Sequence, residues 1–334
     1  MTNNSLLVAG CAILAFSPVA FLFFLLCYSK AHLIIIVTTS AFAYLISSLL
    51  SSLLWLPFSL TGSWTGAGKA ALLVIPAVIC QAACRCGFVV LYHRVEGAIS
   101  ASIRLHERRQ EEQEAEAASE RQAATTTTAT TNNNSNRNSN SSSNSNSNRN
   151  HLETRRLRLE LNDWSCGIAA GIGYSGMHAL MLYGTLLASE AASQGTLYQR
   201  SCPGIPTLAN SALNTFFFSI LDIFLMLIVF YGMRRRRYKR HVASTSIDAV
   251  AVTTGDTNAP KRSANMALLA SFVLHLLAGF TTTANSLQGG CKIALPFLAA
   301  TVLAAGAYLY FVIGLDKFLP KSQRLMYHQA IHQD

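Results

Sequence analysis

Long apolar runs separated by short polar segments dominate the chain. A helix that spans a bilayer needs roughly 20 mostly apolar residues, and seven runs reach that length. They lie at about 6–28, 32–57, 68–93, 164–189, 207–232, 264–285 and 293–315. The pattern predicts an all-α polytopic membrane protein built as a seven-transmembrane helix bundle.

These spans divide the chain into four parts. In the long linker between the third and fourth spans, the residues up to about 123 include several alanines and are predicted to continue the third helix. The Thr/Asn/Ser-rich part that follows, at about 125–150, has almost no apolar residue to bury and is predicted to be disordered. The four parts are spans one to three (1–93), the linker (94–163), spans four to seven (164–315) and a tail (316–334).

Composition and charge agree with a membrane protein. Of the 334 residues, 51% are hydrophobic and 13% are charged, against about 25% charged in a typical soluble chain. The net charge of +10 would also suit a nucleic-acid binder, but Lys and Arg fall in a few blocks between the apolar runs. Such blocks are typical of topology signals, so we expect contact with a lipid bilayer and not with nucleic acid.

The basic blocks also predict how the chain crosses the membrane. Lys and Arg concentrate on alternate segments, most densely at 234–240, while the other side carries only Lys69, Arg200 and Lys292. Cytosolic loops carry the excess of Lys and Arg in membrane proteins. We therefore expect an exoplasmic N-terminus and a cytosolic C-terminus, with the linker and the tail in the cytosol.

Five polar or charged side chains interrupt the predicted spans. A charge in the middle of a bilayer is expensive, so such residues usually face the bundle interior and pair with one another. One interpretation is a buried polar seam that holds helices together by hydrogen bonds, and the others are a metal site, a proton path or an acid catalyst. The five residues are Gln81, Arg85, His178, Asp222 and His275.

Known intramembrane chemistries need more than these residues provide. An aspartyl protease requires two carboxylates at one site, and Asp222 is the only acid in the middle of a span. A retinal protein requires a lysine within its last helix, and Lys317 lies beyond the end of that span. A zinc site requires three ligands and an open position, which His178, Asp222 and His275 supply in number but not in favourable spacing. We expect no catalytic residue, metal or cofactor, and keep a membrane metal-dependent hydrolase using these three residues as the alternative.

Small residues mark one face of the fourth span. Gly167, Gly171 and Ser175 follow one another at four-residue spacing, which lets a neighbouring helix approach closely. His178 lies seven residues after Gly171 and therefore shares this face. We interpret the face as a helix-packing seam that assembly with partner chains requires.

Two of the eight cysteines lie outside the spans. The predicted topology puts Cys202 and Cys291 in exoplasmic loops, where an oxidising compartment permits a disulfide. Two unpaired thiols are the other interpretation, and the sequence leaves both open.

Motifs in six of the spans occur in an order that is known from one family. They are Gly10-Cys11-x-x-x-Ala15-Phe16-x-Pro18, HLIIIVTTSAFAYLISSLLSSLLW, Gln81 with Arg85, Gly167 with Gly171, Arg235-Arg236-Arg237-Tyr238, and His275-Leu276-Leu277. Together they resemble the anterior pharynx-defective (Aph-type) subunit of the gamma-secretase complex. Each motif is weak alone, but their order and spacing are specific, and the similarity extends over all seven spans.

The resemblance implies a function and a set of partners. The function is that of a noncatalytic transmembrane scaffold, which assembles and stabilises a gamma-secretase-type intramembrane aspartyl protease and so supports protein processing. The implied partners are presenilin, nicastrin and the presenilin enhancer subunit, and the implied locations are the endoplasmic reticulum, the Golgi and the plasma membrane. A seven-helix receptor, the third interpretation, has no mark in the sequence beyond the number of spans.

Three positions depart from the family pattern. Ser175 replaces the third glycine of the seam, or this glycine is shifted to Gly176 by one inserted residue, and in either case the position stays small. Ala82 stands where the family has a glutamate, so the carboxylate that would pair with Arg85 on its own helix is missing. Asp222 stands at a family histidine position. We expect His275 to be its first partner and Arg85 its second, since the family places the polar residues of its fifth and sixth spans close together.

Overall fold

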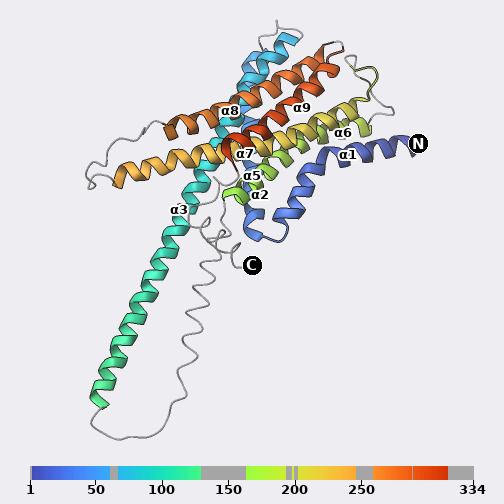
Figure 1. Ribbon diagram of the computed structural model, residues 1–334. Coiled ribbons are helices and arrows are strands. Elements are labelled where there is room, and N and C mark those ends of the chain that lie inside the picture. The colour runs from blue at the N-terminus through green and yellow to red at the C-terminus, as the bar shows by residue number, and fades with distance from the viewer. Residues whose placement is uncertain are drawn as a thin grey trace. The chain divides into compact units, whose positions relative to one another are not determined.

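The computed structural model describes residues 2–60, 67–128, 163–192, 198, 202–245, 259–287 and 289–314, and almost all of them are helical. Apart from one isolated bridge between Tyr198 and Pro206, no β-structure occurs in these ranges. The helices in chain order are α1 (Thr2–Leu22) with η1 (Phe23–Cys27), α2 (Ala31–Leu60), α3 (Ala67–Thr128), α5 (Asp163–Ala179) with η2 (Leu180–Gly184) and α6 (Thr185–Ala192), α7 (Thr207–Thr245), α8 (Ala259–Thr283) with η3 (Ala284–Ser286), and α9 (Cys291–Ala307) with η4 (Tyr308–Ile313) (Figure 1).

Six of the helical segments are long and apolar enough to cross a membrane. They are Leu6–Cys27, Ala31–Pro57, Leu73–Ile99, Thr207–Arg236, Ala264–Thr283 and Cys291–Ile313. The remaining expected span, 164–189, is also helical, over α5, η2 and α6. Its glycines, tyrosines and His178 make it less apolar than the others, and residues 166–175 are buried by other helices. This helix therefore meets protein instead of lipid over that stretch.

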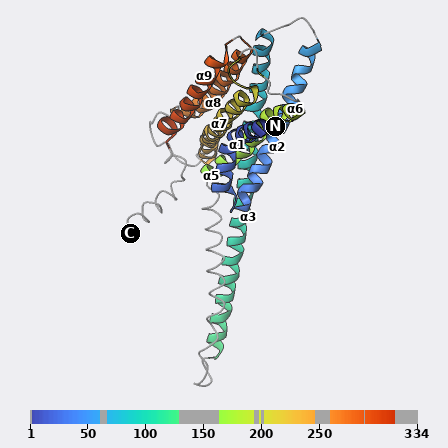
Figure 2. The same cartoon turned by 90° about the vertical axis from the view of Figure 1, so that its right-hand side faces the viewer.

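Helix α7 forms the centre of the bundle. Within its most apolar window 72% of the residues are buried, against 11% to 33% in the other five candidate spans. It contacts α1, α5, α8 and α9, and α5 in turn packs on α2 (Figure 2). Helices that surround α7 keep large apolar side chains on their outer faces, such as Phe21, Phe42 and Phe311. This arrangement suits a bundle whose solvent is hydrocarbon.

The chain separates into two units, and α3 contributes to both. One unit comprises residues 1–89 and 163–334, and the other comprises residues 90–162. In the second unit α3 remains helical to Thr128, past the predicted end near residue 123, so the helix also includes the first residues of the stretch predicted to be disordered. The rest of that stretch, and the tail from residue 315, lie outside the described residues.

The small residues of α5 lie at contacts with two other helices of the same chain. A methyl group built on Gly171 would lie 2.9 Å from the Ile223 Cα of α7, and one on Gly167 would lie 3.0 Å from the Leu227 side chain. On another face, a methyl group on Gly173 would collide with the Val37 carbonyl oxygen of α2. Ser175 is fully buried. The predicted packing seam therefore holds α5 against the chain's own α7.

The contact at Gly171 predicts a loss of stability when the residue is enlarged. Gly171→Ala should lower the unfolding free energy by about 1–3 kcal/mol, because a methyl group meets backbone atoms that cannot move aside easily. Thermal unfolding of the purified chain in detergent micelles measures this. Gly87→Ala is the matched control, because a methyl group there meets no atom within 4 Å, and it should unfold at an unchanged or slightly higher temperature. Equal unfolding temperatures for Gly171→Ala and Gly87→Ala would show that Gly171 is not needed for close packing.

Candidate functional site: a buried charged cluster

Four polar side chains from four helices meet in the interior of the bundle. Arg85 comes from α3, His178 from α5, Asp222 from α7 and His275 from α8. All four are buried, and Arg85 and Asp222 are 1% and 0% exposed. A charge removed from water this completely is stable only with an opposite charge and hydrogen bonds around it.

Hydrogen bonds connect the four side chains in a single chain. Arg85 Nη2 donates to Asp222 Oδ1 in an ion pair. Arg85 Nη1 lies 3.0 Å from His275 Nδ1, and because a guanidinium can only donate, His275 accepts with a neutral ring. On the other side, His178 Nδ1 donates to Asp222 Oδ2 over 2.6 Å. Arg85 and Asp222 thus each contact two members of the cluster.

Aromatic rings surround the charged groups. The Arg85 guanidinium carbon lies 4.5 Å from the centroid of the Tyr174 ring, a cation–π contact that gains strength where water is absent. The ring of Tyr44 stacks on His178 with centroids 5.0 Å apart and 26° between the planes. Tyr174 and Ser47 also share a hydrogen bond of 3.4 Å between their hydroxyl groups. These contacts bring α2 into the site as a fifth helix.

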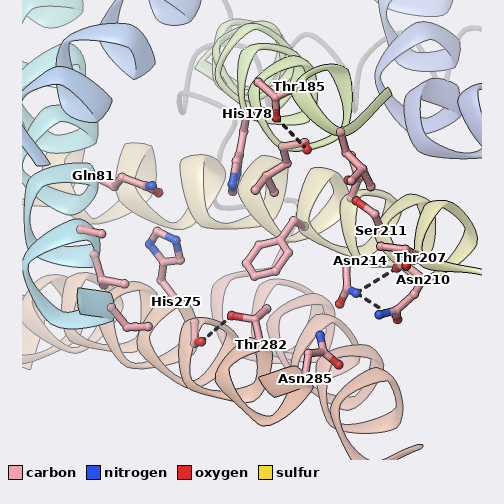
Figure 3. A pocket seen from close by; sticks show the side chains of 18 of the residues that line it. Gln81, His178, Thr185, Thr207, Asn210, Ser211, Asn214, His275, Thr282 and Asn285 are labelled. Carbon is pink, nitrogen blue, oxygen red and sulfur yellow. Dashed lines mark hydrogen bonds between the residues drawn. The ribbon is translucent and has the colours of Figure 1, made fainter. Parts of the chain in front are cut away.

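A cavity of about 620 Å³ lies beside the cluster. Gln81, His178 and His275 line it together with Asn210, Asn214 and Asn285 near the start of α7 and the end of α8 (Figure 3). The side-chain oxygens of Gln81, Asn214 and Asn285 are buried and have no hydrogen-bond partner among the described protein atoms. Such groups usually bind ordered water.

Four of the five predicted seam residues are brought together, and the fifth lies to one side. Gln81 lines the cavity, and its backbone carbonyl oxygen accepts a hydrogen bond from the Tyr174 hydroxyl group over 3.4 Å. The expected order of partners for Asp222 is wrong. Its oxygens contact Arg85 and His178, and His275 reaches the carboxylate only through Arg85. The forked guanidinium of Arg85 lies between the side chains of Asp222 and His275 and donates a hydrogen bond to each of them.

The arrangement does not favour a metal ion. No group of three His, Cys, Asp or Glu side chains in the described part of the chain is arranged to hold one. Of the three ligands of the alternative hydrolase, His178 contacts Asp222 directly, but His275 is separated from Asp222 by the positive charge of Arg85. A divalent cation at this position would meet that charge directly. The cluster is suited to holding helices together.

Cys202 and Cys291 lie next to each other at one end of the bundle. They are joined in a disulfide with a Cα–Cα distance of 5.9 Å, and their sequence separation is 89. Cys202 precedes α7, and Cys291 is the first residue of α9. The bond therefore links the beginnings of two helices that also pack on each other.

A comparison with family models identifies the protein class. The model described as Aph-1 protein matches residues 6–316, nearly the whole chain. The chain belongs to the Aph-1 family. Proteins of the Aph-1 family are subunits of gamma-secretase, so this chain is a multi-pass membrane subunit of such a complex. A search of curated proteins gives no match.

The geometry explains two of the departures from the Aph-1 pattern. The carboxylate that is missing at Ala82 on α3 is replaced by Asp222 on α7, and its side chain still reaches Arg85. An ion pair depends on the distance between the charges and not on which helix carries them. In this Aph-1 chain the carboxylate that balances Arg85 therefore comes from another helix, α7.

Mutation of the ion pair should show strong coupling. Arg85→Met and Asp222→Asn each leave one buried charge without its partner, which should cost about 3–5 kcal/mol of unfolding free energy. The double variant leaves neither, so its loss should be clearly smaller than the sum. Unfolding of the four proteins in micelles completes the cycle. The control is the combination of Arg85→Met with Asn285→Ala, for which the losses of unfolding free energy should be additive. Additive losses for Arg85→Met with Asp222→Asn would disprove the pairing.

The disulfide predicts a count of reactive thiols. Six cysteines form no disulfide and two are bonded to each other, so alkylation of the denatured, non-reduced chain should modify six positions, and eight after reduction. Peptide mass spectrometry identifies the sites. Closing a loop of roughly 90–100 residues is worth about 4–5 kcal/mol in the chain-entropy model, so Cys202→Ser should lower stability markedly. Labelling of Cys202 and Cys291 before reduction would show that the bond is absent.

Proposed function

We propose that this chain is a noncatalytic scaffold of a gamma-secretase-type intramembrane aspartyl protease. In this role it binds presenilin and nicastrin within the membrane and stabilises their assembly, with the presenilin enhancer subunit as the fourth member. The observation that carries the proposal is the buried cluster of Arg85, Asp222, His178 and His275 in a chain of the Aph-1 family. Both carboxylate oxygens of Asp222 and both Nη atoms of Arg85 are used in contacts between helices.

The cluster supports a scaffold because it fixes one helix arrangement. Arg85 and Asp222 hold α3 to α7, His178 adds α5, and His275 adds α8. Any separation of these helices would leave a charge unpaired in hydrocarbon. A partner that recognises the outer faces of these helices would meet a constant surface.

We propose seven transmembrane helices with an exoplasmic N-terminus and a cytosolic C-terminus, with α5, η2 and α6 forming the fourth span. Two features support this orientation independently. The dense basic run at 234–240 lies at the end of the α7 span. Such an excess of Lys and Arg is typical of cytosolic segments. The disulfide lies at the opposite end of α7, where an oxidising compartment would preserve it. This topology is consistent with residence in the endoplasmic reticulum, the Golgi and the plasma membrane.

Affinity purification tests the proposal directly. A tagged chain isolated in mild detergent from cells that contain the complex should recover presenilin, nicastrin and the presenilin enhancer subunit, identified by mass spectrometry. Asp222→His should reduce this recovery several-fold, because Arg85 then has no carboxylate. Adding Ala82→Glu returns an acid to α3, three residues before Arg85, and should restore it. Failure of the unmodified chain to recover these proteins would refute the scaffold function.

The neighbouring alanine provides a matched control for the restored acid. Ala83 is exposed on the outside of α3, so Glu at this position adds the same charge on another face of the helix. Asp222→His with Ala83→Glu should remain impaired. Equal recovery by both double variants would show that the position of the acid does not matter, and unchanged recovery by Asp222→His alone would show that assembly does not depend on the cluster.

A further inference from the structure

The end of α7 carries a dense block of positive charge. The apolar span ends at Arg236, while the helix continues to Thr245. Six of the seven residues in 234–240 are Lys or Arg, over a helix length of about 10 Å. The block therefore begins where the membrane core ends.

The start of α8 adds to the same positive region. Arg236 Nε and Nη2 both donate to Asn265 Oδ1 of α8, over 3.1 and 2.6 Å, which fixes the two helix ends side by side. Lys261 and Arg262 lie in the first turn of α8, where the helix dipole is positive. The basic residues at 234–240 and 261–262 thus belong to two helix ends that contact each other.

The helices that form the site carry no acidic residue near this block. Neither α7 after Asp222, nor α8, nor α9 with η4 contains an Asp or Glu. The partner of Arg236 is a neutral amide, and the Arg236 side chain is exposed. Its guanidinium has five N–H groups, of which Asn265 accepts two, so three remain for a ligand. Arg235 lies 5.0 Å from the centroid of the Tyr231 ring, a contact that also restricts its position.

We propose that this basic site, formed by residues 234–240 of α7 and 261–265 of α8, binds the headgroup of a polyanionic membrane lipid of the phosphatidylinositol phosphate class. A zwitterionic headgroup brings no net charge, and a headgroup with one negative charge engages only part of the block. A phosphorylated inositol carries several phosphate charges at the depth where the α7 span ends. Juxtamembrane clusters of four to eight basic residues attract such lipids, and guanidinium groups match phosphate oxygens in pairs. This role is additional to the proposed scaffold function.

Native mass spectrometry of the full chain tests the site. The chain in micelles is mixed with equal amounts of phosphatidylinositol bisphosphate, phosphatidylserine and phosphatidylcholine, and the retained lipids are counted. Phosphatidylinositol bisphosphate should be retained most, and its retention should fall with added salt. Arg236→Gln should weaken this retention about fivefold, the change expected for one basic side chain. Arg108→Gln removes one cation from the α3 extension, where Glu112 lies four residues on, and should leave the retention unchanged.

A second variant separates lipid binding from folding. Asn265→Asp gives Arg236 a charged partner and so strengthens the contact between α7 and α8. It also neutralises part of the site, so the retained lipid should decrease about fivefold or more while the thermal stability stays the same or rises. Unchanged retention in both Arg236→Gln and Asn265→Asp would overturn the proposal. Soluble inositol trisphosphate should compete only weakly, and full displacement at equal concentration would indicate a site for soluble phosphates instead of lipids.

Discussion

A buried ion pair between Arg85 and Asp222 constrains the packing of this bundle. Hydrocarbon cannot solvate either charge, so each charged group must keep its partner as long as the helices are in the membrane. The two residues belong to α3 and α7, so those helices must stay within the reach of the two side chains and one hydrogen bond. His178 also contacts Asp222 and His275 also contacts Arg85, which extends the same constraint to α5 and α8.

Close packing around α7 makes this central position attainable. The carboxylate of Asp222 can be surrounded by three other helices only if their backbones come near to α7. Gly171 allows this on α5, because it leaves no side chain between its backbone and Ile223. Association of helices in a membrane depends on such contacts, since lipid removes most of the hydrophobic driving force. The small residues and the charged cluster therefore act together. The small residues let the helices approach α7 closely, and the cluster then joins the helices through paired charges.

Periodic and compositional features could be predicted from the sequence, while contacts between helices could not. Apolar length identified the six helices that are long and apolar enough to cross a membrane, and also the helical stretch 164–189, because burial in a bundle and burial in lipid both select apolar residues. Charge within apolar runs identified Arg85, His178, Asp222 and His275, since membranes tolerate such residues only where they pair. The order of the partners of Asp222 was wrong, because spacing along a helix does not fix its rotation against its neighbours. Tyr174 was missed, although its position four residues before His178 places it on the same helical face.

The location of the acid changes what the ion pair does. A glutamate at the position of Ala82 would lie on the same helix as Arg85, where the two charges can neutralise each other before the helices associate. Asp222 lies on α7, so Arg85 gains its counter-charge only when α3 and α7 come together. In this chain the pairing of charges and the packing of helices are therefore a single event. The free α3 helix would be less stable in the membrane than one that contains its own acid, and the packed bundle would be correspondingly harder to separate.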